Sequence, residues 1–352
     1  MQRLEERLER LDEQTREIEA ASQQPVACDQ DEVWWPQLIE FFGGEDAMFV
    51  KLRINRSVFD DALVLVQDVA LETRGRRGSI RSNREKLFFL VVFLSRGVEV
   101  LEVLVTAQIR TREHIIKRAK SIAMLFRPRL VGMGVRFYNE VDAEVPDAAL
   151  IVDCTVCQIK RPKRPFDEAK VFFSGKHFVY AIKKEVCVNT RTGTAAMVSK
   201  GYPSSVHDIT LLRDHAAALN VVLGGRSVLA DLGYRGAARD VPTLVVCDQA
   251  QQALRAKRVR VECFFGRLKL LWSVFATKWR LGEECFDLFF DTACGLTNLD
   301  ILRRPLNRQD RAFNEGVLVS IFIENERRRE RQRLANEAYR DGRRARLGID
   351  DE

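Results

Sequence analysis

The chain has 352 residues, with 57 lysines and arginines against 50 aspartates and glutamates, and a formal net charge of +7. This length allows two or more domains, and the positive charge, with a pI near 9.0, favours a polyanionic partner. A run of about 18 uncharged apolar residues, which a membrane span requires, does not occur, and the first residues do not have the form of a signal peptide. The eight scattered cysteines are typical of a reducing compartment.

Residues 1–31 predict a helix followed by a linker. Apolar residues recur at a heptad-like spacing, at Leu4, Leu8, Leu11 and Ile18, between charged residues. A stripe of this kind predicts a short helix that assists dimer formation. Residues 21–31 have the composition of a linker.

Residues 32–130 predict an all-helical domain. A buried helix is expected over residues 86–94, and two more over 98–105 and 111–126, with Pro128 ending the last. A helix, a turn and a basic second helix form the layout of a helix-turn-helix DNA-binding domain. An ordinary helical bundle with a basic solvated face would have the same pattern. The basic residues expected to contact DNA here are Arg112, Lys117 and Arg118.

An apolar, β-branched stretch after Pro146 predicts a buried strand that carries Asp153. Alternate residues of a strand share a face, so Asp153, Thr155 and Cys157 are expected on one side and Cys154 on the other. Cys154 and Cys157 form the one CxxC motif of the chain. Their opposite orientations argue against a zinc site.

Two basic segments follow this strand. Residues 160–165 form a loop with the composition of a nuclear-import patch, and residues 174–177 read Ser-Gly-Lys-His. The loop is predicted to contact the phosphates of DNA. The side chains concerned are Lys160, Arg161, Lys163 and Arg164.

A second aspartate, Asp231, stands at the end of another apolar strand, just before a glycine at which the chain can turn. Strands over residues 178–188 and 194–199 and a helix over 209–220 are expected before it. Aspartate is disfavoured in strands and costly to bury unpaired, so Asp153 and Asp231 each require a partner. A hard divalent cation is one such partner. A turn or a salt bridge would explain either acid alone.

The stretch 255–269 predicts a basic amphipathic helix with a single carboxylate, Glu262. Arg258 lies one turn before Glu262 and Lys269 two turns after it, on the same side of the helix. Such an edge suits a divalent metal beside a phosphate backbone, whereas a solvated helix is the alternative. Residues 148–305 are predicted to form one α/β domain, and 306–352 a charged tail. Within this tail, residues 324–346 are expected to form a solvated helix or to be disordered.

In chain order, Asp153, the segment Ser-Val-His-Asp that ends at Asp208, the segment Ala-Asp-Leu-Gly-Tyr around Asp231, and the Arg-Glu-Lys helix resemble a DDE transposase. The sequence is most similar to the PIF/Harbinger and IS5-like branch, the DDE superfamily endonucleases, over roughly residues 50–300. The resemblance implies an RNase H-like domain, a mixed sheet with flanking helices, after a helix-turn-helix-like domain. In that fold the first and fourth strands lie side by side beneath the helix that carries the glutamate.

The resemblance also implies an activity and its partners. Asp153, Asp231 and Glu262 would be the catalytic triad and would hold two Mg²⁺ or Mn²⁺ ions, which cut and join phosphodiester bonds. Arg258 and Lys269 would face DNA, namely the transposon terminal repeats and a target site. Residues 174–177 are similar to the Arg/Ser-Gly-Lys segment of the family, which would place Lys176 near a phosphate of this DNA. Further implied partners are other copies of the chain and a Myb-like accessory protein. The place of action would be the nucleus in a eukaryote and otherwise the cytoplasm.

Some positions depart from the family pattern. Residues 153–156 read Asp-Cys-Thr-Val, where the family commonly has Asp-Gly-Thr-His. Asp208 is a rival to Asp231 as the second acid, although it follows a Pro-Ser-Ser turn and is expected to cap a helix. Its neighbour His207 would contact substrate, orient a carboxylate or serve as a turn residue. Two other functions fit the sequence, a domesticated DNA- or protein-binding relative without transposition activity and an interaction protein whose acids pair with arginines.

Overall fold

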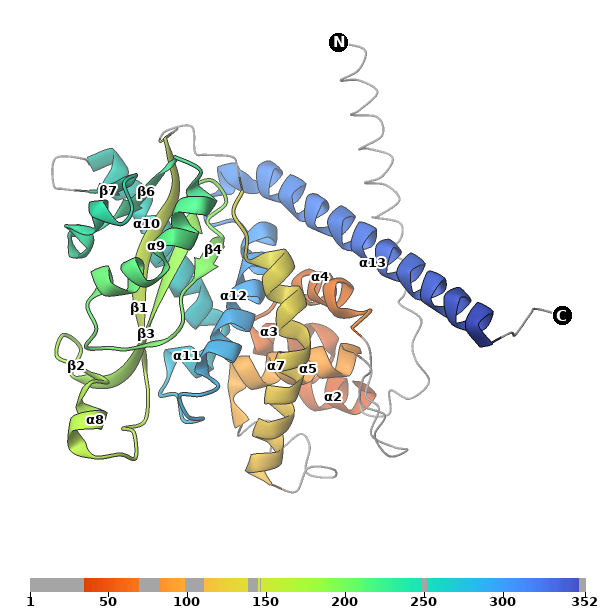
Figure 1. Ribbon diagram of the computed structural model, residues 1–352. Helices are drawn as coiled ribbons and strands as arrows, with labels where there is room; N and C mark the ends of the chain where they lie inside the picture. Colours follow the sequence, from red (N-terminus) through yellow and green to blue (C-terminus); the bar gives the residue numbers. More distant parts are fainter. Residues whose placement is uncertain are drawn as a thin grey trace, which may run out of the picture.

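The computed structural model describes residues 35–69, 83–98, 111–138, 145, 147–247 and 252–347. A helical region comes first, a mixed sheet with flanking helices follows, and a long helix comes last (Figure 1). This order confirms the predicted α/β fold class. The predicted helix and linker over residues 1–31 and most of the predicted helix over 98–105 lie outside the described residues, so both stay predictions.

The helical region is built from apolar helices that share one core. Helix α5 is apolar on all sides over residues 87–94, and each of these side chains is buried. A helix that is hydrophobic all round belongs in a core, where other helices can surround it. The helices of this region are α2 (Trp35–Phe42), α3 (Glu45–Leu52), α4 (Arg56–Val66), α5 (Asn83–Arg96) and α7 (Arg112–Gly134).

Helix α7 continues through Pro128, so the prediction that Pro128 ends this helix was wrong. Proline lacks the backbone N–H and therefore removes one hydrogen bond from a helix interior. Leu130 and Met133, beyond the proline, are buried in the core that α7 shares with helix α12 (Phe286–Arg303). Burial of two such side chains contributes about 3–6 kcal/mol, which is enough to offset the lost hydrogen bond.

The sheet has seven strands in the order β2-β3-β1-β6-β7, with β4 and β5 also paired to β3. Strand β1 lies in the middle, antiparallel to β3 and parallel to β6. The first and fourth predicted strands are therefore neighbours, as expected. The strands are β1 (Ala148–Gln158), β2 (Phe173–Ser174), β3 (Val179–Asn189), β4 (Ala195–Val198), β5 (Tyr202–Pro203), β6 (Ser227–Ala230) and β7 (Leu244–Val246).

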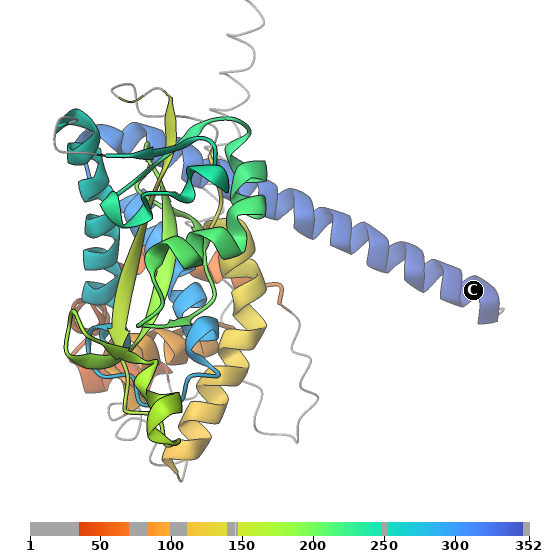
Figure 2. The same ribbon diagram turned by 60° about the vertical axis from the view of Figure 1, so that its left-hand side comes forward.

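Different helices cover the two faces of the sheet. Ile151 and Cys157 of β1 belong to a large core with α10 (Gln252–Leu271), α11 (Ser273–Ala276) and α12. Leu150 and Val152 belong to a second core with α9 (Asp208–Leu223), against which Cys154 also packs. Figure 2 shows the sheet between α10 and α9. The alternation confirms that Cys154 and Cys157 point to opposite faces.

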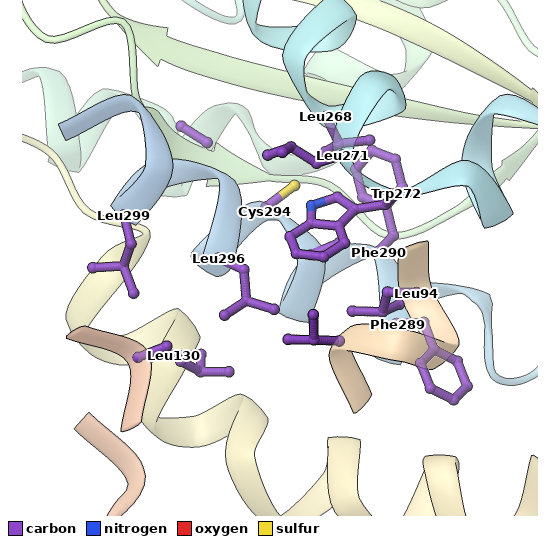
Figure 3. Packing of buried hydrophobic residues seen from close by; sticks show 14 of the residues in the cluster. Leu94, Leu130, Leu268, Leu271, Trp272, Phe289, Phe290, Cys294, Leu296 and Leu299 are labelled. Carbon is purple, nitrogen blue, oxygen red and sulfur yellow. The ribbon is translucent and has the colours of Figure 1, made fainter. Parts of the chain in front are cut away.

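Helix α12 connects the sheet to the helical region. Figure 3 shows its side chains between Leu268 and Trp272 on one side and Leu94 of α5 and Leu130 of α7 on the other. A Cβ atom at Gly295 of α12 would lie 2.5 Å from the Leu130 carbonyl oxygen. A glycine at this position therefore permits the close approach of the two helix backbones.

Buried ion pairs join the same parts. The Lys184 ammonium of β3, which is fully buried, lies 2.9 Å from a carboxylate oxygen of Asp287 and 3.1 Å from one of Asp291, both on α12. Arg127 of α7 donates to the other Asp291 oxygen at 2.7 Å. Because unpaired buried charges are costly, these contacts fix the sheet, α12 and α7 relative to one another.

The charged tail forms helix α13 (Arg311–Leu347). Of the two predicted alternatives, a helix and a disordered segment, the structure has the helix. Val317, Leu318, Ile321 and Phe322 in its first half are buried against the large core. The second half is exposed and runs away from the body of the molecule (Figures 1 and 2). Arginine and glutamate one turn apart, such as Arg333 and Glu337, support the helix there.

Candidate active site

Asp153 and Asp231 occupy neighbouring positions on two parallel strands. Ile151 of β1 is paired with Leu229 of β6. Each aspartate follows its paired residue by two positions, so the two acids emerge at the same level of the sheet. The register, which is a property of the folded sheet, therefore brings together two carboxylates that are 78 positions apart in the chain.

One arginine faces both carboxylates. An Nη atom of Arg258 on α10 lies 3.6 Å from Asp153 Oδ2 and 4.0 Å from Asp231 Oδ2. Backbone amides hold the remaining oxygens, since the Cys154 N–H donates to Asp153 Oδ1 at 2.7 Å and the Gly233 N–H donates to Asp231 Oδ1 at 2.9 Å. Both acids are thus oriented from two sides, and the positive charge between them comes from α10.

The pKa of Asp153 is raised from 3.8 to about 6. Burial is the main cause, and the nearby carboxylates of Asp231 and Asp208 raise the pKa further. The Cys154 N–H and Arg258 lower it without cancelling these effects. A further cation beside Asp153 would lower this pKa and favour the ionised carboxylate.

Asp208 lies close to the same pair. A Cβ atom at Gly233 would lie 3.0 Å from Asp231 Oδ1 and 3.6 Å from Asp208 Oδ2. Asp208 accepts a 2.7 Å hydrogen bond from Lys183 of β3. It is the first residue of α9 and not its cap, so the expected capping role was wrong. The cap position belongs to His207, an exposed residue whose side chain forms no capping bond.

Glu262 lies on α10, one turn after Arg258, and its side chain is exposed. It forms no hydrogen bond or ion pair with the residues that the structure describes. Lys269, two turns further on, donates to the Val156 carbonyl of β1 at 3.1 Å and so lies against the sheet. The described part of the chain contains no group of three His, Cys, Asp or Glu side chains arranged to hold a metal.

The other basic residues named from the sequence differ in their surroundings. Arg112 and Lys117 are exposed near the start of α7, whereas Arg118 is half-buried over the Phe89 ring. Lys160, Arg161, Lys163 and Lys176 are exposed. Arg164 forms an ion pair with Glu283 at 3.0 Å.

The polar groups on the opposite face of the sheet were not predicted from the sequence. Glu185 is fully buried, with an oxygen 2.8 Å from His215 Nε2, and burial raises its pKa. Tyr234 lies near it, with its hydroxyl 3.3 Å from Cys154 Sγ. The signal that could have revealed this cluster is the charged triplet that runs from Lys183 to Glu185 in an otherwise apolar strand.

A mixed sheet with two adjacent aspartates on its central strands, beneath a basic helix, is an arrangement suited to a nuclease-type domain. Residues 152–298 match the DDE superfamily endonuclease family. This part of the chain, which contains all three predicted triad positions, is therefore a DDE superfamily endonuclease domain of the Harbinger type. Comparison with curated proteins and with solved structures found no match. Within the described residues, each helix is too short or too polar to cross a membrane.

Proposed function

We propose that this protein is a DNA transposase that cleaves and joins phosphodiester bonds at transposon ends, with Asp153, Asp231 and Glu262 as its catalytic triad. The observation that carries the proposal is the parallel register of β1 and β6, which sets the two aspartates side by side. Asp231 is preferred to Asp208 as the second acid because it shares this register, whereas Asp208 is neutralised by Lys183.

The residues suit a divalent metal in their chemistry. The three side chains offer only carboxylate oxygens, which Mg²⁺ and Mn²⁺ prefer. Burial and the neighbouring carboxylates raise the pKa of Asp153, so a cation beside it would stabilise its ionised form. Bound there, a pair of such ions would activate the attacking oxygen and stabilise the leaving oxygen. Asp153 and Asp231 would hold the ions from the sheet and Glu262 from α10.

The basic residues outline a path for DNA. Arg258 and Lys269 lie along α10, and the loop 160–165 follows the far end of β1. The start of α7, with Arg112 and Lys117, lies at the same end of the molecule as that loop in both views (Figures 1 and 2). DNA that binds along this end would neutralise its phosphates with the exposed cations of the loop 160–165 and of the start of α7. Partners proposed beyond DNA are further copies of the chain and a Myb-like accessory protein.

The proposal is tested by nicking of supercoiled plasmid in Mg²⁺ or Mn²⁺. Asp153→Ala, Asp231→Ala and Glu262→Ala should each lower the rate by about two orders of magnitude or more, because members of one catalytic unit fail together. Asp208→Ala should retain most of the activity. Asp240→Ala, which alters a carboxylate outside the site, serves as the control.

Two outcomes would change the assignment. Loss of nicking in Asp208→Ala with retention in Asp231→Ala would move the second acid to Asp208. DNA binding by the wild-type protein without cleavage, with and without Mn²⁺ and with an accessory protein supplied, would favour the domesticated DNA-binding relative.

A further inference from the structure

Three of the five exposed large aromatic side chains among the described residues lie in one short segment of the chain. Phe166 is 60% exposed, Phe173 is 37% exposed and Phe178 is 80% exposed. They belong to helix α8 (Phe166–Lys170), to strand β2 and to the turn between β2 and β3. Aromatic rings are usually buried, so their exposure at this density marks a binding surface. We call residues 160–180 the aromatic hairpin.

The backbone holds Phe178 outward. Its φ angle is 55°, in the left-handed region that bulky residues rarely adopt. The Phe178 N–H donates to the Ser174 carbonyl at 2.8 Å, and the His177 N–H donates to Ser174 Oγ at 3.3 Å. Ser174 itself is buried, so the turn is anchored to the body of the domain. A strained residue held in place by its surroundings is typical of functional sites.

Cations alternate with the rings of the aromatic hairpin. The Arg161 guanidinium lies 5.9 Å from the centre of the Tyr180 ring, and Tyr180 in turn contacts Phe173 at a centroid distance of 5.4 Å. Lys163 and Lys176 are exposed beside them. Rings for stacking and cations for phosphates are the two components of a single-strand DNA binding surface. An apolar protein partner would account for the rings but not for the cations among them.

We propose that the aromatic hairpin binds unpaired DNA, with the Phe178 ring stacked on a nucleobase and Lys176 beside a phosphate. This inference rests on the proposed function, because it assigns a strand-separating contact to the same endonuclease. DNA of any sequence can be bound in this way, since every base has a face on which an aromatic ring stacks.

The pairing of β1 and β3 determines how far Phe178 lies from the two aspartates of the candidate active site. Val186 of β3 is paired with Asp153, and Phe178 precedes Val186 by eight residues. At about 3.3 Å per residue, the ring lies roughly 26 Å along the strand from the acid pair. A strand whose bases keep the roughly 3.4 Å spacing of a duplex would place the stacked base about eight nucleotides from the cleaved phosphate.

The test measures binding of the full-length protein to fluorescein-labelled single-stranded dT20 by anisotropy, over a series of salt concentrations. Phe178→Ala should weaken binding about tenfold, from the loss of one stacked base, and should leave the salt dependence unchanged. Lys176→Ala should reduce the salt slope by about 0.7, from the loss of one phosphate contact. Phe41→Ala, an exposed ring in the helical region, serves as the matched control.

A conservative variant separates stacking from misfolding. Phe178→Trp should restore the affinity for dT20, and bound DNA should quench the fluorescence of the new tryptophan. Equal affinities of the wild-type protein and Phe178→Ala for dT20, or no quenching in Phe178→Trp, would overturn the inference. Failure of the proposed function is distinguishable, because it would appear in a different assay. It would be seen as plasmid nicking that is unchanged in the Asp153→Ala variant, and not as a change in the binding of dT20.

Discussion

Arg258 of α10 lies 3.6 Å from the carboxylate of Asp153 on β1. The contact links the basic helix to the central strand at the point where the carboxylates of Asp153 and Asp231 lie side by side. Glu262 follows Arg258 by one turn on the same helix. The guanidinium supplies part of the positive charge that the acid pair requires, so a divalent cation and Arg258 would share the task of neutralising it.

Replacement of Arg258 by alanine should make the protein more dependent on a divalent cation. Without metal, Arg258→Ala should lose about 1–2 kcal/mol of stability, because two partly buried carboxylates lose their counter-charge. Addition of Mn²⁺ should then raise its melting temperature more than that of the wild-type protein. Arg258→Lys should be intermediate. Equal shifts in all three proteins, measured by thermal unfolding, would contradict this role of Arg258.

Replacement of Asp153 by asparagine should stabilise the metal-free protein at neutral pH. The pKa of Asp153 is about 6 in the folded protein, against an ordinary value of 3.8 that applies to the unfolded chain. The folded state therefore holds this proton more tightly. Ionisation of Asp153 as the pH rises from about 4 to above 6 therefore costs folding free energy. Asp153→Asn should gain about 1–3 kcal/mol at pH 7.5 and little near pH 3.5.

Urea unfolding in EDTA at these two pH values measures the effect. A gain of stability that does not depend on pH would show that ionisation of Asp153 is not its cause. Asp240→Asn, outside the site, is the control.

Replacement of Lys184 by alanine should destabilise the whole fold. The variant leaves Asp287 and Asp291 without their buried partner, which costs about 3–5 kcal/mol. Lys200→Ala removes a lysine that is largely exposed and should cost less than about 1 kcal/mol. Asp291→Asn in the Lys184→Ala background should recover part of the loss. Additive effects of the two changes in urea unfolding would argue against direct coupling.

Replacement of Gly295 by alanine should separate α7 from α12. The added methyl group would meet the Leu130 carbonyl oxygen, a backbone atom that cannot move alone, and we expect a loss of about 1–3 kcal/mol. Gly132→Ala on α7 adds the same group where nothing lies within 4 Å. That control should be neutral or slightly stabilising, as alanine favours helix. Urea midpoints that change equally in both variants would contradict the packing argument.

Much of the fold was predictable because its signals are local. The apolar run around Asp153 indicated a strand, and the basic amphipathic run around Glu262 indicated a helix, without reference to any other part of the chain. Alternation along a strand also predicted that Cys154 and Cys157 would face opposite sides. The end of α7 was not predictable in this way, because burial of Leu130 and Met133 outweighs the local effect of Pro128.

The sequence by itself determined the candidate acids, the basic helix and the family pattern, because residue type and local periodicity carry this information. The tertiary structure alone decided which groups meet. The parallel register set Asp231 beside Asp153, and the packing of α10 brought Arg258 to both. It also paired Asp208 with Lys183 and left Phe178 exposed on its turn. Register and helix packing depend on burial summed over the whole core, which no short segment encodes.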